Sequence, residues 1–144
     1  DYAESTLMIN DISIDESSKL AEVTALLGDY DRIKVEEGFS NYFFDEYGIM
    51  LIENKNKSQL HGLMVQLTDQ DNEFSTTKAF SGKLYVYTKK VNPFKGMGFM
   101  ERLIKDISPR DTEGYKLTGA TEVLKVDFLY KPGGSMQLLF VNFL

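Results

Sequence analysis

Alternating hydrophobic and polar positions predict β-strands along most of this chain, because side chains of a strand point to opposite faces in turn. Turn residues separate the alternating segments, most clearly at Asp45-Glu46-Tyr47-Gly48 and at Pro132-Gly133-Gly134-Ser135. A further turn or bulge is expected at Asn10-Asp11. We expect strands at residues 7–14, 32–35, 42–44, 49–52, 60–68, 80–91, 116–118, 123–131 and 136–144.

One segment near the N-terminus has helical spacing instead. Leu20, Val23 and Leu27 recur at intervals of three and four, which places them on one face of an amphipathic helix. Residues 15–18 supply N-cap candidates, and Gly28 is suited to the C-cap. The pattern therefore predicts a helix that ends at Gly28 and packs one face on a sheet.

A second helix is expected after Asn92-Pro93, with Pro109 as its end. With it, residues 7–67 and 83–144 both run strand–helix–strand–strand–strand, which suggests a tandem repeat whose halves share one core. The predicted fold class is thus α+β: a single domain, 1–144, with an antiparallel twisted sheet and two helices on one face. A single α+β sheet without a repeat is the alternative.

Charge is concentrated at one end of the chain. The 144 residues carry 16 basic and 22 acidic side chains, a net charge of −6. Residues 1–46 hold 12 of the acids and three of the bases. The overall balance argues against nucleic-acid binding, which requires basic residues against phosphates. The acidic segment is either a solvated face or an electrostatic attraction for a basic protein partner.

The chain offers little for catalysis or metal binding. It has no Cys and one His, so thiol chemistry and two-histidine sites are excluded. His61 lacks a partner motif that would make it a general base. The acids of 69–73 resemble the start of a calcium loop, but Phe74 and Phe80 stand at its Gly and Glu positions. Gly96-Met97-Gly98 lacks the rest of a dinucleotide fingerprint. We expect no catalytic residue, metal or cofactor.

No apolar run approaches the roughly 20 residues that span a bilayer. The chain begins with Asp1 and not with Met, so a signal or a lipid-attachment Cys would lie upstream. The sequence therefore leaves two compartments possible: the periplasm or envelope, and the cytoplasm.

The strand at 136–144 is apolar on both faces and is expected at the centre of a sheet, with dimerisation through an exposed edge as the alternative. The protein is expected to be a monomer or a weak dimer.

Aromatic side chains mark a candidate binding face. If Leu84 and Val86 face the core, then Tyr85 and Tyr87 stand on the open face of their strand. Tyrosine is a favoured interface anchor, although ordinary amphipathic packing explains the same pattern. Acidic pairs in the N-terminal third would attract the partner. The candidate partner-binding residues are Tyr85, Tyr87, Tyr42, Phe44, Glu36, Glu37, Asp45 and Glu46.

Four short motifs resemble a recurring bacterial pattern: Leu7 to Ile14, Leu26 to Ile33, Phe44 to Ile49 and Phe80-Ser81-Gly82-Lys83-Leu84. The pattern is similar to small bacterial envelope or immunity-type proteins, most of unknown function, some of which resemble inhibitors of secreted toxins. The predicted architecture also resembles the β-lactamase inhibitor protein and related outer-membrane assembly lipoproteins. The motifs consist of turn and core residues, so they carry over fold and no catalytic residue.

These observations favour a non-catalytic protein-binding module. The resemblance implies a bacterial immunity-type inhibitor, periplasmic or envelope-anchored, that binds and neutralises a basic toxin or effector protein. Two alternatives stay open. One is a structural envelope lipoprotein that aids assembly, and the other is a small-ligand carrier, which would need a deep pocket between helix and sheet.

Overall fold

The computed structural model of the chain describes most of the first two thirds and the strands of the last third. The described residues are 7–10, 12–15, 18–56, 59–68, 78–86, 89–92, 102, 110–113, 116–120, 124–130 and 136–143.

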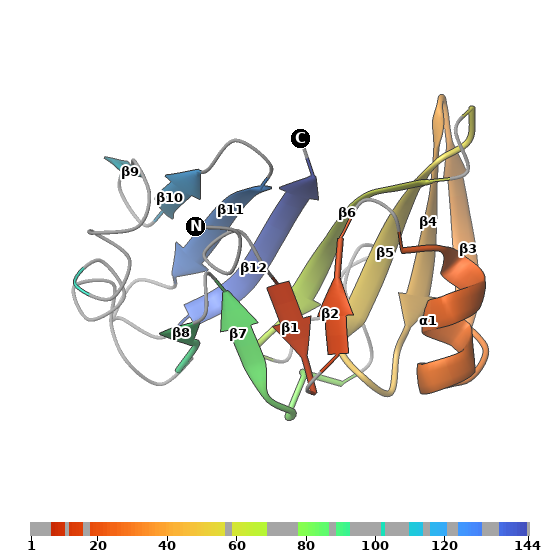
Figure 1. Cartoon of the computed structure of the whole chain (residues 1–144), viewed down its shortest axis with the longest axis horizontal. Helices are drawn as coiled ribbons and strands as arrows, with labels where there is room; N and C mark the ends of the chain where they lie inside the picture. Colours follow the sequence, from red (N-terminus) through yellow and green to blue (C-terminus); the bar gives the residue numbers. More distant parts are fainter. Residues whose placement is uncertain are drawn as a thin grey trace.

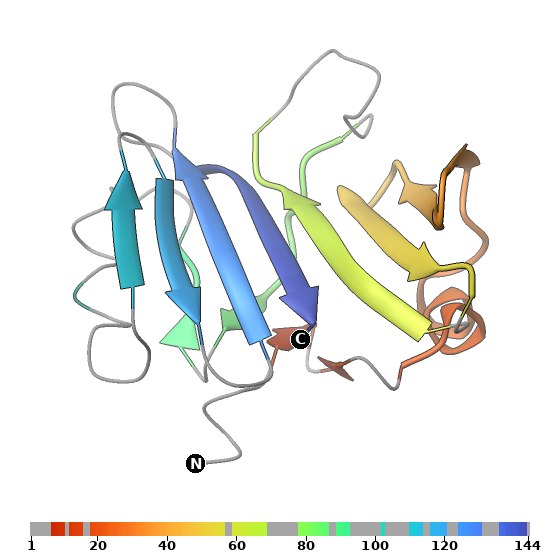
Figure 2. The same ribbon diagram turned by 90° about the horizontal axis from the view of Figure 1, so that it is seen from above.

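Eight strands form one large antiparallel sheet in the order β3-β4-β5-β6-β12-β11-β10-β9. Four consecutive strands from each half of the chain contribute to it, and the two sets meet where β6 pairs with β12. Figure 2 shows this sheet with the remaining strands behind it. The eight strands are β3 Arg32–Glu36, β4 Phe39–Phe44, β5 Ile49–Asn54, β6 Gln59–Gln66, β9 Arg110–Glu113, β10 Lys116–Ala120, β11 Leu124–Tyr130 and β12 Met136–Phe143.

A second, small sheet has the order β2-β1-β7-β8 and is also antiparallel. It lies across β6, β12 and β11 of the large sheet (Figure 1). Its centre again joins the two halves of the chain, because β1 pairs with β7 with Met8 opposite Tyr85. The four strands are β1 Leu7–Ile9, β2 Ile12–Ile14, β7 Leu84–Val86 and β8 Lys89–Lys90.

The helix α1, Leu20–Leu27, covers the end of the large sheet that the small sheet leaves open (Figure 1). Val23 on its inner face is buried, and Leu20 and Leu27 pack against the core. The helix ends as expected, because Gly28 has a φ of 87° and its N–H donates to the Thr24 carbonyl. The expected N-cap is wrong: Lys19 occupies that position without a side-chain cap.

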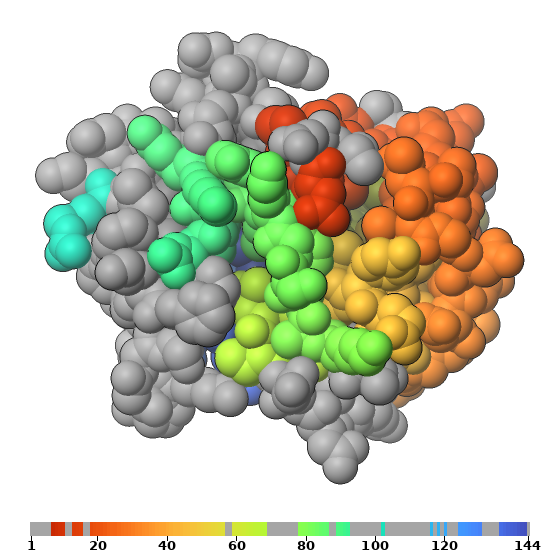
Figure 3. Space-filling view, turned by 90° about the horizontal axis from the view of Figure 1, so that it is seen from below, coloured from red at the N-terminus to blue at the C-terminus, as the bar shows by residue number. Residues whose placement is uncertain are grey.

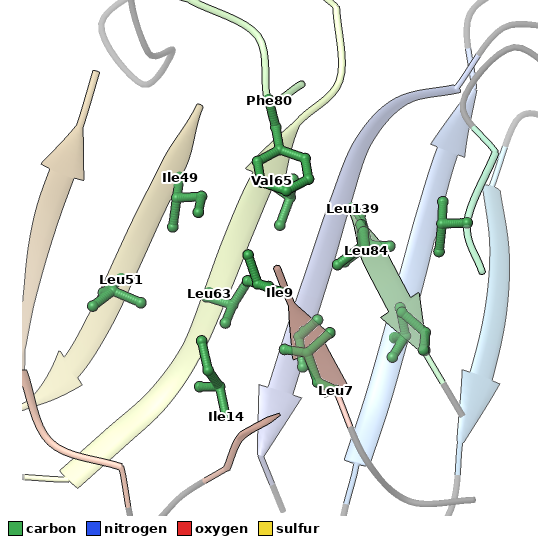
Figure 4. Close-up of a cluster of buried hydrophobic side chains, with 14 of the residues drawn as sticks. Leu7, Ile9, Ile14, Ile49, Leu51, Leu63, Val65, Phe80, Leu84 and Leu139 are labelled. Carbon is green, nitrogen blue, oxygen red and sulfur yellow. The ribbon is translucent and has the colours of Figure 1, made fainter. Parts of the chain in front are cut away.

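One buried hydrophobic cluster fills the space between the two sheets and α1. Leu7, Val65, Val126 and Phe128 are fully buried in it, so the cluster joins both sheets and both halves of the chain. Figure 4 shows side chains of β1, β5, β6 and β12 converging in this layer. A second cluster lies on the opposite face of the large sheet, where Phe43, Met50 and Met64 are buried. The central strands are therefore apolar on both faces.

The predicted fold class is wrong, because the structure is mostly β with two antiparallel sheets. The face assigned to two helices is covered mainly by the small sheet, and α1 is the one helix among the elements of the described part. The order strand–strand–helix–four strands in the first half also replaces the expected strand–helix–strand–strand–strand. The second helix, expected from 92 to 108, falls outside the described residues except for Asn92 and Arg102.

Individual strands differ from the prediction in informative ways. The single strand expected over 80–91 is replaced by the short β7 and β8, and Phe80 precedes them in irregular structure. The strand at the start of the chain divides into β1 and β2 around Asn10, whose φ of 50° confirms the predicted turn. The C-terminal strand β12 lies between β6 and β11, so its predicted central position is confirmed.

A buried tyrosine in the main cluster leads to a pH prediction. Tyr130 is 4% exposed, and its hydroxyl finds no hydrogen-bond partner in the described part of the chain. Burial raises the pKa of the Tyr130 hydroxyl above its ordinary value near 10.0. Above that pH the unfolded chain releases a proton that the native state retains, so the free energy of unfolding falls as pH rises.

We therefore expect Tyr130→Phe to raise the free energy of unfolding by about 1 kcal/mol at neutral pH, because the variant removes a buried hydroxyl that has no hydrogen-bond partner. Above about pH 10 the natural protein should lose up to about 1.4 kcal/mol per pH unit relative to the variant. Urea unfolding of both proteins between pH 7 and 11 measures this difference. If the difference in unfolding free energy between the two proteins stays constant from pH 7 to 11, the raised pKa of Tyr130 is contradicted.

Candidate functional site

The exposed large hydrophobic side chains of the described residues all lie in one short stretch of sequence. Such side chains, when they gather in a patch, mark interaction surfaces more often than isolated ones do. Val35 is 60% exposed and Leu26 is 56% exposed, and the others are exposed by about two fifths. We call these residues the apolar patch: Leu26, Tyr30, Ile33, Val35 and Tyr47.

The centre of the apolar patch is the edge strand β3. Only β4 pairs with β3 among the described strands, so its other edge is open. Ile33 lies opposite Tyr42, and Tyr42 packs its ring edge-on against Tyr30 with centroids 4.8 Å apart. Since Ile33 and Val35 alternate with charged residues, they share the face that Tyr42 and Tyr30 occupy. The patch therefore continues from the edge strand towards α1.

Four of the five residues of the apolar patch lie within the acidic segment, residues 1–46, and Tyr47 directly follows it. Residues 26–47 contain six acidic and two basic side chains. Glu36 and Glu37, both predicted as binding residues, are exposed at the turn that ends β3, next to Val35. Apolar side chains among mostly acidic neighbours favour a partner of opposite net charge, because the charges steer its approach.

The other predicted acidic pair has a structural role. Asp45 is 9% exposed, and its carboxylate pairs with the Arg32 guanidinium at 3.2 Å. Its backbone N–H donates to the Asp31 carboxylate at 2.7 Å, and its carbonyl accepts from the Lys78 N–H at 3.0 Å. Glu46 is exposed and forms an ion pair with the Lys78 ammonium at 2.7 Å. Asp45 therefore fastens the 45–48 turn to β3 and to the segment at Lys78.

The predicted aromatic anchors occupy three different environments. Phe44 is 1% exposed in the main core and is not available to a partner. Tyr42 is half-buried, and its hydroxyl donates to the Glu53 carboxylate at 3.2 Å. Burial, and secondly the charge of Glu53, raise the pKa of Tyr42. Tyr85 is half-buried between Leu84 and Val86, which are buried as expected, while Tyr87 lies outside the described residues.

An apolar cavity of about 200 Å³ opens beside the apolar patch. Its walls come from β1, β2, α1 and β5, which contribute buried side chains, and Leu26 and Tyr47 of the patch also line it. Figure 3 shows this face of the molecule, where the red β1–β2 residues lie near the orange residues of α1. The buried wall residues are Ile9, Ile14, Val23, Ile49 and Leu51.

Leu27 of α1 completes the apolar part of the lining. The remaining lining residues are polar and lie along β1–β2, just before α1 and on α1: Asn10, Ser13, Ser18 and Glu22. Glu22 is the side chain among the lining residues that is charged at neutral pH, and it is exposed. The cavity is therefore an apolar hollow whose lining carries one negative charge and no positive charge.

The described residues hold no cluster of His, Asp or Glu that could bind a metal ion. His61 is half-exposed on β6, where its ring contacts Phe39 with centroids 4.8 Å apart. Within the described part of the chain, no helix has the length and apolar character that crossing a bilayer would need.

Sequence reasoning missed the apolar patch, although a signal was present. Arg32-Ile33-Lys34-Val35-Glu36 places a charge at every second position, which is typical of an edge strand. A strand at the edge with only one neighbour leaves its apolar residues exposed, so Ile33 and Val35 were candidates from the sequence alone.

Comparison with known families gave one finding. A family model described as a domain of unknown function, DUF7738, matches residues 1–97. The match includes the whole apolar patch and every residue that lines the cavity. Neither the comparison with curated proteins nor that with solved structures found a match.

Proposed function

We propose that this chain, which belongs to the DUF7738 family, is a non-catalytic module that binds a net-basic protein partner through the apolar patch. One observation carries the proposal: the exposed large hydrophobic side chains of the described residues fall between Leu26 and Tyr47, in the acidic segment or directly after it. Interfaces combine desolvated apolar anchors with a charged rim that selects the partner, and this patch has both parts.

In its most specific form, the proposed activity is that of an immunity-type inhibitor that neutralises a basic toxin or effector in the periplasm or envelope. The motif resemblance suggests this form, and the charge of the patch fits a basic target. A structural envelope protein that aids assembly is the alternative form. The two forms differ in their partner, which makes the partner's identity the decisive observation.

The test is co-purification of the tagged protein from its native cells, at low and at high salt, with bound proteins identified by mass. We expect one stoichiometric net-basic protein that is lost as salt rises. If that protein is an enzyme whose activity disappears in the complex, the inhibitor form is supported. An envelope-assembly component would favour the alternative, and recovery of no partner at low salt would overturn the proposal.

Two matched variants locate the interface. Ile33→Ser combined with Val35→Ser should weaken partner binding by about 100-fold, because each truncated anchor costs about 1.4 kcal/mol. The melting temperature should change little, since both side chains are exposed. Lys90→Ser, at an exposed position of the small sheet, should leave binding unchanged. Equal binding by both variants would place the interface elsewhere.

A further inference from the structure

We infer that the cavity between α1, β1–β2 and β5 receives one aromatic or branched aliphatic side chain that the protein partner carries beside a positive charge. The inference rests on the proposed function and deepens it, because it names the part of the partner that is recognised. Hot spots of interfaces are anchor side chains that fill such pockets, surrounded by contacts that exclude water. The cavity adjoins the apolar patch through Leu26 and Tyr47, so one partner segment can engage both.

The size of the cavity suits a single side chain. Its volume is about 200 Å³, and an apolar protein cavity of roughly 150 Å³ is large enough to bind benzene. Ile14, Val23 and Leu51 of its wall are each less than a tenth exposed, so an entering ring exchanges water for apolar contacts. Longer ligands would extend past the mouth at Leu26 and Tyr47.

The charge of the cavity lining determines which charged group can lie beside the apolar side chain of the partner. Glu22 lies on the exposed side of α1 at the cavity, and no Lys or Arg lines it. A carboxylate beside an apolar hollow favours an apolar group followed by a cation and disfavours an anion of the same shape. The acidic excess of the surrounding segment acts in the same direction.

Hydrogen bonds to Lys83 hold the part of the cavity wall that Asn10 forms. Asn10 has a φ of 50°, in the left-handed region that residues other than glycine seldom adopt. Two hydrogen bonds of 2.8 Å hold it there, from the Asn10 N–H to the Lys83 carbonyl and from the Lys83 N–H to the Asn10 side-chain oxygen. A wall held in one conformation lowers the entropy cost of binding.

The experiment uses the purified full chain and three small probes of one shape: 2-phenylethylammonium, 2-phenylethanol and phenylacetate. Titrations are followed by the amide shifts of the isotope-labelled protein. We expect saturable shifts at β2, α1 and β5, with the ammonium binding about tenfold tighter than the carboxylate, which corresponds to about 1.4 kcal/mol. Absence of saturable shifts, or equal binding of the ammonium and the carboxylate, would overturn the inference.

Three variants test the assignment residue by residue. Leu27→Trp fills the cavity and should abolish probe binding, whereas Val35→Trp places the same ring outside the cavity lining and should not. Glu22→Gln should bring the ammonium and carboxylate affinities within about twofold of each other while phenylethanol binds as before. If Leu27→Trp loses its dispersed amide spectrum, Leu26→Trp at the exposed mouth replaces it.

The outcome for the partner separates this inference from the proposed function. Leu27→Trp should weaken binding of the captured partner at least tenfold, in parallel with the loss of probe binding. If the partner binds the Leu27→Trp protein as it binds the natural one, the cavity is not the anchor site, yet the patch-mediated function stands. If no partner is found while the probes bind with the expected preference, the proposed function fails. The inference that a partner side chain occupies the cavity then fails as well.

Discussion

Replacing Gly48 by alanine should destabilise the protein by about 3 kcal/mol, which is a large share of the stability of a domain this size. Gly48 has a φ of 69°, and left-handed backbone costs a residue with a side chain about 1–2 kcal/mol. A Cβ there would also collide with the backbone of 78–80, where the Lys78 carbonyl oxygen would lie 2.9 Å away. Overpacking adds roughly 1–3 kcal/mol.

The contact matters because the segment at Phe80 and the end of β6 share hydrogen bonds with this turn. The Gln66 N–H donates to the Gly48 carbonyl at 2.8 Å, and the Phe80 N–H donates to the Gln66 carbonyl at 2.7 Å. Gly38 is the matched control, since its φ of 81° is similar but a Cβ would meet nothing within 4 Å. Chemical denaturation should show a loss near 1 kcal/mol for Gly38→Ala, and equal losses for both variants would contradict the packing around Gly48.

The second large effect is expected at Phe44. Sequence reasoning placed this ring on a binding surface, and the structure places it in the main core at 1% exposure. Phe44→Ala should therefore lower the free energy of unfolding by about 3–5 kcal/mol, through lost transfer energy and the cavity left behind. The melting temperature should fall by about 10 °C or more.

Tyr47→Ala is the control for this variant, because Tyr47 lies in the adjoining turn and is 43% exposed. Its truncation should change the stability by less than about 0.5 kcal/mol. Thermal and urea unfolding of the two variants, measured side by side, decide the assignment. A mild effect at Phe44 together with a strong effect at Tyr47 would mean that the 45–48 turn is oriented the other way.

Local sequence signals predicted the elements that end at characteristic turn residues such as glycine. The helix ends at Gly28 and the 45–48 turn closes on Gly48, because glycine tolerates the positive φ that each place requires. The pairing of β11 with β12 was predicted from two long strand patterns on either side of the sequence Pro132-Gly133-Gly134. These predictions depend on residues within a few positions of one another, so the sequence pattern contains most of the information.

The second sheet could not be read in the same way. Strands were expected within 7–14 and 80–91, but β1, β2 and β7 have three residues each, which is too short for their patterns to indicate which strands they pair with. Their stability comes from pairing Leu7 with Val86 and Ile9 with Leu84 across the chain, and from burial on the large sheet. Such long-range contacts leave no local signal, so the covering layer was assigned to helices.

For the candidate site, the sequence predicted the acidic character, but it counted Phe44, a buried core residue, among the exposed aromatic candidates. Charge is additive along a chain, so the excess of acids before residue 47 could be counted directly. Whether an aromatic ring is an anchor or core depends on which face of its strand is covered. Tyr42 and Phe44 do share a face, but that face is the inner one, and the exposed residues of the edge strand are Ile33 and Val35.

The pairing of β6 with β12 has a consequence for how the protein is made. β6 ends at Gln66 and β12 begins at Met136, so the ribosome completes one sheet-forming strand long before its neighbour exists. Until then, the edge of β6 that later binds β12 is unpaired, in a strand that is apolar on both faces. We therefore expect the nascent chain to be prone to aggregation in that interval, with slow folding or chaperone dependence originating at this edge.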